Sequence, residues 1–151
     1  LLENYGDVYY EAYYFMLGPS VYDRSLLEIS AHSPVHLLIT DPLGRKTGYD
    51  PISDTWWDEI PNAGYSISSI AGPDGTLLPE SKILIIPQPI IGNYDLDVIG
   101  YDDGSYEINI FDTDSSGEIT QTDFSGEVEN GSVDDYPITV YEKLYLPLIV
   151  K

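Results

Sequence analysis

Residues 92–126, which read GNYDLDVIGYDDGSYEINIFDTDSSGEITQTDFSG, decide the fold class. From Tyr94 to Val98, and again from Tyr106 to Ile110, apolar side chains alternate with polar ones. A period of two places the apolar side chains on one face of a strand and the polar ones on the other. Gly104 and Gly117 each close a short polar segment and can supply the positive φ of a tight turn. We therefore predict three consecutive antiparallel strands that form a β-meander.

Outside this stretch, apolar segments of strand length recur about every 8–12 residues, which is typical of an all-β sandwich or barrel. Residues 45–63 are predicted to be a loop, and Asn130-Gly131 predicts a two-residue hairpin. The whole of residues 1–151 is predicted to form one domain. The further predicted strands are 25–31, 35–40, 65–70, 82–87, 137–142 and 144–150.

The charge of the chain excludes several kinds of partner. With 26 acidic and 6 basic residues, the formal net charge is −20, which would repel nucleic acid phosphates and anionic lipid headgroups. The longest apolar stretches, at 82–88 and 144–150, are far shorter than the roughly 20 residues of a membrane helix, so no membrane insertion is expected. The fold can tolerate this charge through spacing on solvated faces, high external salt or bound divalent cations. The last two indicate an extracellular or cell-surface location.

Two segments carry a resemblance to a known family. Ser33–Pro51, SPVHLLITDPLGRKTGYDP, has a strand followed by a D-P-x-G turn, and Ile86–Gly126 has a G-x-Y-x-L-x-V strand followed by a meander. Over about half of the chain this resembles immunoglobulin-like β-sandwich modules of secreted bacterial proteins. The resemblance implies an all-β, immunoglobulin-like antiparallel β-sandwich with an adhesive, spacing or stabilising role. Such modules carry no fixed catalytic residues, so none is transferred here.

The sharpest local pattern resembles a calcium loop. Residues 112–123, DTDSSGEITQTD, have the ligand spacing of an EF-hand or dockerin repeat, with hard oxygen ligands and a glycine at the bend. The last ligand departs from the EF-hand pattern, because it is Asp where a bidentate Glu is usual. The flanking residues alternate like strands, so the alternative is a plain hairpin with its tip at Ser115-Ser116-Gly117. If the segment is a plain hairpin, no cofactor is required. If it is a calcium loop, calcium is the cofactor. The candidate metal ligands are Asp112, Asp114, Ser116, Glu118 and Asp123.

Aromatic residues suggest a second kind of site. Trp56, Trp57 and Tyr49, with Tyr65 nearby in the chain, could form a platform for sugar rings, because exposed aromatic side chains in loops often take part in recognition. The alternative is that one tryptophan covers the core. The first interpretation predicts a glycan or cell-surface partner.

The terminal segments are apolar on both faces. Along 144–150, Leu144, Leu146, Leu148 and Val150 share one face, while other apolar side chains occupy the second. Residues 7–17 are equally two-sided and read as a strand, or as a short helix. Such strands lie either in the core of their own domain or are donated to a neighbouring subunit, as in some pili. Residues 1–17 and 144–151 are therefore candidate exchanged or edge strands of a homo-oligomer or polymer.

The chain contains none of the nucleophile, phosphate-binding or dinucleotide-binding motifs of common enzymes, so no enzyme activity is predicted. The predicted function is that of a non-catalytic extracellular structural or adhesive module, with the pilus-like filament subunit as one form of it. The alternative is a carbohydrate-binding or calcium-stabilised accessory module of a secreted multidomain enzyme.

Overall fold

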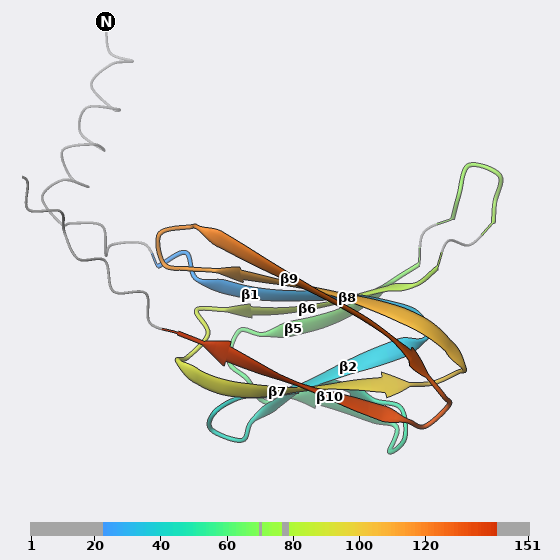
Figure 1. Ribbon diagram of the computed structural model, residues 1–151, viewed down its shortest axis with the longest axis horizontal. Coiled ribbons are helices and arrows are strands. Elements are labelled where there is room, and N and C mark those ends of the chain that lie inside the picture. The colour runs from blue at the N-terminus through green and yellow to red at the C-terminus, as the bar shows by residue number, and fades with distance from the viewer. Residues whose placement is uncertain (1–22, 70, 77–78, 142–151) are drawn as a thin grey trace, which may run out of the picture.

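The computed structural model describes residues 23–69, 71–76 and 79–141, and in this part of the chain ten strands form two packed antiparallel sheets (Figure 1). One sheet has the order β5-β6-β1-β8-β9 and the other the order β10-β7-β2-β3-β4. The described residues contain no helix, so the predicted all-β sandwich is confirmed. The strands are β1 (Leu26–His32), β2 (Val35–Thr40), β3 (Lys46–Asp50), β4 (Thr55–Asp58), β5 (Gly64–Ser68), β6 (Ser81–Pro87), β7 (Gly92–Gly100), β8 (Gly104–Thr113), β9 (Ile119–Val128) and β10 (Val133–Val140).

The alternation seen in residues 92–126 does place the apolar side chains between the layers. In β7, Leu96 and Val98 are completely buried, and in β8 Ile108 is as well. Tyr94 and Tyr106 are almost completely buried in the same core. Burying one aliphatic side chain of this size is worth about 1.5–3 kcal/mol, so these two strands supply much of the driving force for packing.

The predicted meander is wrong at its first turn. β8 and β9 pair as a hairpin, but β7 pairs with β2 and β10 in the other sheet. The turn between Gly100 and Gly104 therefore crosses from one layer to the other. Alternation reports which face of a strand is buried, and that face is the same whether the next strand lies beside it or opposite it. The sequence pattern could not distinguish the two arrangements.

The hairpin predicted at Asn130-Gly131 is wrong for the same reason. The turn connects β9 to β10, which belong to different sheets and do not pair with each other. Gly131 has a φ of 82°, as a tight turn requires, and its N–H donates to the carbonyl of Gly100 at 2.8 Å. A turn signal thus marks a chain reversal and leaves the pairing of its flanks open.

Residues 45–63, predicted to be a loop, contain the short strands β3 and β4. The sheet accommodates a close approach at Gly48, which has a φ of 134°. A Cβ atom added there would lie 2.1 Å from the carbonyl oxygen of Leu37, so the position requires glycine. A glycine and the turn at 51–54 interrupt any alternation in this segment, which is why no strand was predicted.

The predicted terminal strands lie outside the described residues. These are 7–17 and 144–150, including Leu144, Leu146, Leu148 and Val150. Strand exchange therefore stays a prediction.

Candidate functional site

A row of contacting rings runs from the exposed edge of the β3–β4 hairpin towards the core. The ring centroids of Tyr49 and Trp56 are 4.7 Å apart, and those of His36 and Tyr49 are 4.8 Å apart. His36 continues the row to Tyr101 at 4.9 Å. The ring centroid of Tyr65, from β5 in the opposite sheet, lies 5.9 Å from that of Trp56. The row joins both layers and reaches solvent at Trp56.

Tyr49 and Trp56 form the exposed end of this row, which we call the aromatic platform. They are direct partners in the register of β3 with β4, so both rings project from the same face. Trp56 is 60% exposed, and its ring is tilted by 32° to that of Tyr49. The Tyr49 hydroxyl donates to Asp54 Oδ1 at 2.7 Å, and this hydrogen bond raises the pKa of Tyr49. The carboxylate therefore fixes the orientation of the tyrosine ring.

The structure separates Trp57 from the platform. It follows Trp56 in β4 and so projects from the opposite face of the strand, where its register partner is Gly48. The ammonium group of Lys46 lies 5.3 Å from the centre of the Trp57 ring, a cation–π contact. Of the predicted trio, Trp56 and Tyr49 come together and Trp57 does not.

Behind the platform, His36 and Tyr65 connect the two sheets. The Tyr65 hydroxyl lies 3.0 Å from His36 Nδ1 and accepts the backbone N–H of Leu37 at 3.2 Å. His36 is 9% exposed. Burial, and after it the charge of Lys82, lower the pKa of His36 to about 4. His36 is therefore neutral at physiological pH.

The inner end of the row meets a buried lysine. Lys82 is completely buried, and its ammonium group hydrogen-bonds to Ser33 Oγ and the Tyr101 hydroxyl, each at 3.0 Å. The third partner is Glu80 Oε2 at 3.1 Å. An ammonium group has three donors and no lone pair, so all of its capacity is used. These contacts tie the two layers together at the inner end of the row.

The sequence did not indicate that His36 and Tyr101 belong to the row of contacting rings. They lie far from Trp56 in the sequence and reach it only through the packing of β2 and of the turn after β7. A polar or aromatic residue inside an apolar strand, as His36 is in β2, is the one signal that could have indicated a special environment.

The predicted calcium ligands lie along the β8–β9 hairpin. Asp114 Oδ1 accepts hydrogen bonds from the Ser116 N–H and hydroxyl and from the Glu118 N–H, so this carboxylate organises the turn. Asp112 pairs with Thr120, and Asp123 pairs with Asn109 three positions further along the ladder. At about 3.4 Å per residue, the backbones at Asp112 and Asp123 are therefore about 10 Å apart along the strand direction. Nowhere in the described chain do three or more acidic, histidine or cysteine side chains gather as a metal site would need.

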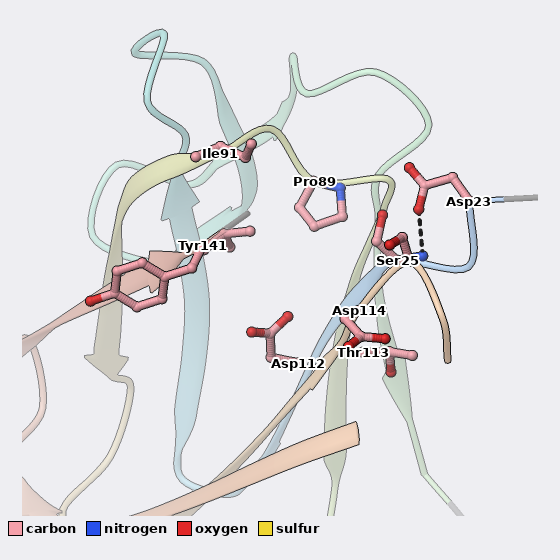
Figure 2. Close-up of a pocket in the computed structure, with 10 residues that line it drawn as sticks. Asp23, Ser25, Pro89, Ile91, Asp112, Thr113, Asp114 and Tyr141 are labelled. Atoms are coloured by element: carbon pink, nitrogen blue, oxygen red, sulfur yellow. Dashed lines mark hydrogen bonds between the residues drawn. The ribbon is translucent and has the colours of Figure 1, made fainter. Parts of the chain in front are cut away.

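Asp112 and Asp114 also border a cavity of about 260 Å³ at this end of the sandwich (Figure 2). Its other walls include Asp23, whose carboxylate accepts the backbone N–H of Ser25 at 2.9 Å, and Tyr141. Asp23 and Tyr141 are the first and last described residues, so this cavity lies where the described chain begins and ends.

Among the residues that the structure describes, no helix has the length and hydropathy to cross a membrane. Comparison of the chain with models of protein families, with curated proteins and with solved structures found no match.

Proposed function

We propose that the chain is a non-catalytic, extracellular adhesive β-sandwich module that binds glycans on the aromatic platform of Trp56 and Tyr49. The proposal rests on one observation: Trp56 is 60% exposed although it belongs to a strand of a well-packed sandwich. An exposed aromatic ring that packs at a fixed orientation against Tyr49 offers a preformed apolar surface for binding.

The chemistry of the platform suits a sugar. The C–H face of a pyranose ring is apolar, and an exposed indole offers a rigid apolar surface of comparable size. The adjoining turn adds the Asp50 and Asp54 carboxylates, and Asp50 already accepts the Ser53 hydroxyl at 2.6 Å. Carboxylate oxygens beside an aromatic face can accept hydrogen bonds from sugar hydroxyls. A neutral glycan also avoids the repulsion that a net charge of −20 exerts on anions.

The formal net charge of −20 supports the extracellular location, because high external salt or bound divalent cations would help the fold to tolerate it. The filament form of the predicted function depends on 144–150, and the calcium-stabilised form depends on an ion at 112–123. Both of these stay predictions.

A glycan array tests the proposal. The intact protein is expected to bind a subset of neutral glycans, and Trp56→Ala is expected to lose those signals. Trp57→Ala is a matched control, because it removes the same side chain from the other face of the same strand. Equal signals for Trp56→Ala and the wild-type protein, with both folded, would contradict the proposal.

A further inference from the structure

A second hollow, of about 200 Å³, lies where three connections meet beside the start of β3. The connections run from β2 to β3, from β4 to β5 and from β6 to β7. Its apolar floor contains Ile60, Ile86 and Tyr94, all at least 96% buried. Its polar groups come from Arg45, Asn62 and Gln88, and we call it the Arg45 hollow.

The arginine in this hollow is held by a buried carboxylate. Arg45 Nε donates to Asp41 Oδ2 at 2.7 Å, and Nη2 lies 2.6 Å from the same oxygen. The Asp41 side chain is completely buried, and its Oδ1 accepts the N–H groups of Leu43 and Arg45, each at 2.9 Å. The guanidinium group is thereby fixed in direction and balanced in charge. Its Nη1 group makes no hydrogen bond within the described part of the protein.

Asn62 and Gln88 share an unusual backbone conformation. Their φ angles are 60° and 50°, in the left-handed region that residues other than glycine rarely adopt. Across residues 23–69, 71–76 and 79–141, neither side-chain amide makes a hydrogen bond. Residues held in this region often occur at ligand-binding positions. Both are exposed at the rim of the same hollow, so two carboxamides and the Nη1 group of Arg45 face solvent there and are accessible to a ligand.

We propose that the Arg45 hollow is a second binding site, and that its ligand is one neutral sugar ring. A carboxamide both donates and accepts hydrogen bonds, as a hydroxyl does, whereas an ionised carboxylate only accepts. The charge of Arg45 is already balanced by Asp41, and the net charge of −20 opposes an anionic ligand. The apolar surface that a ligand can reach comes from Pro61, Pro87, Pro89 and Ile90, and it matches the C–H face of a sugar.

The size of the hollow agrees with this ligand. At about 30 Å³ for each water, it holds roughly six or seven water-sized groups, which matches the six ring atoms of a pyranose, so the hydroxyl groups of the sugar would lie at the rim. This site does not depend on the aromatic platform, because none of the residues that line it belongs to the platform.

The test is a titration of the full ¹⁵N-labelled chain with the methyl glycosides of glucose, galactose and mannose. With at least one of them, the side-chain amide signals of Asn62 and Gln88 are expected to shift and to saturate below about 100 mM. The double variant Asn62→Gly, Gln88→Gly removes both amides, and glycine adopts the left-handed conformation without strain, so the fold is retained. Its affinity, measured from the backbone amide signals of residues around the hollow, is expected to be at least about tenfold lower. Gln121→Ala, which removes an exposed amide that lies on the edge strand β9 and does not line the hollow, is the control and should bind normally.

Three results would overturn this inference: no saturable shift with any of the three glycosides, unchanged affinity in the double variant, or tighter binding of methyl glucuronide than of the neutral glycosides. Trp56→Ala should leave the Asn62 and Gln88 shifts unchanged. Failure of the aromatic platform and failure of the Arg45 hollow can therefore be distinguished in one series.

Discussion

Replacing the buried Lys82 with methionine is expected to cost little stability. Methionine keeps the unbranched stem and most of the volume, so the core stays filled. The Ser33 and Tyr101 hydroxyls lie 3.0 Å apart and keep each other as partners, while the Glu80 side chain is 44% exposed and can be hydrated. Since no buried polar group is left without a partner, Lys82→Met should change the free energy of unfolding by no more than about 1 kcal/mol.

Removing the acceptor instead of the lysine is expected to cost more. In Glu80→Ala the Lys82 ammonium group remains completely buried with its countercharge gone. Loss of one partner of a fully buried ion pair costs about 3–5 kcal/mol, and the partial exposure of Glu80 reduces this to about 1–3 kcal/mol through solvent screening. Glu80→Ala should therefore be the less stable of the two variants, although it alters the more exposed residue.

Urea denaturation gives the free energy of unfolding of each variant. Variant m-values equal to that of the wild-type protein would show that the same unfolding transition is compared. NMR titration of His36 gives an independent readout, because the charge of Lys82 lowers its pKa and that of Glu80 raises it. Lys82→Met should move the pKa of His36 up from about 4, and Glu80→Ala should move it down. A larger stability loss in Lys82→Met, or a pKa of His36 that ignores both changes, would refute the reasoning.

The depressed pKa of His36 also sets a direction for the pH dependence. The folded protein holds His36 neutral down to about pH 4, whereas the unfolded chain takes up this proton near pH 6.5. This stabilisation is present above pH 6.5 and is lost as the pH falls to about 4. At 1.36 kcal/mol for each pKa unit, the shift from 6.5 to about 4 contributes about 3 kcal/mol to the free energy of unfolding. It should be smaller in Lys82→Met.

Two further substitutions test contacts of tyrosine side chains, one between the layers and one between neighbouring strands of a sheet. Tyr65→Phe removes the acceptor of the Leu37 N–H, so it should cost about 1–3 kcal/mol of unfolding free energy, and a loss below the error of urea denaturation would contradict the assigned hydrogen bond. Gly126→Ala places a Cβ 2.6 Å from the Tyr106 hydroxyl and should lower stability by about 1–3 kcal/mol in thermal denaturation. Gly64→Ala, where a Cβ meets nothing within 4 Å, is its control, and equal melting temperatures for the two alanine variants would be evidence against this contact.

How much of the fold could be predicted depends on the range of the interaction. The alternation in 94–98 and 106–110 correctly indicated which side chains enter the core, because burial of one face is a local property of a strand. Sheet membership is not local. The turns after Gly100 and at Gly131 carry ordinary turn chemistry, and only the packing of distant strands determines that each crosses between layers.

The candidate site shows the same limit. Tyr49 and Trp56 were predicted together, and their register in β3 and β4 confirms that they are neighbours. Trp57 was grouped with them because sequence adjacency suggests proximity, whereas consecutive residues of a strand face opposite ways. Once β4 is recognised as a strand, this separation follows from the sequence. The link to Lys82 comes from the opposite sheet and could not be anticipated.

The central claim is that the exposed face of Trp56 binds a glycan. Its most direct test is a calorimetric titration of the best ligand from the array against Trp56→Ala and Trp57→Ala in parallel. An aromatic residue at the centre of a binding site typically contributes about 2 kcal/mol or more, so Trp56→Ala should weaken binding by about thirtyfold or more, and Trp57→Ala by less than about threefold. Equal affinities of the two variants would contradict the account.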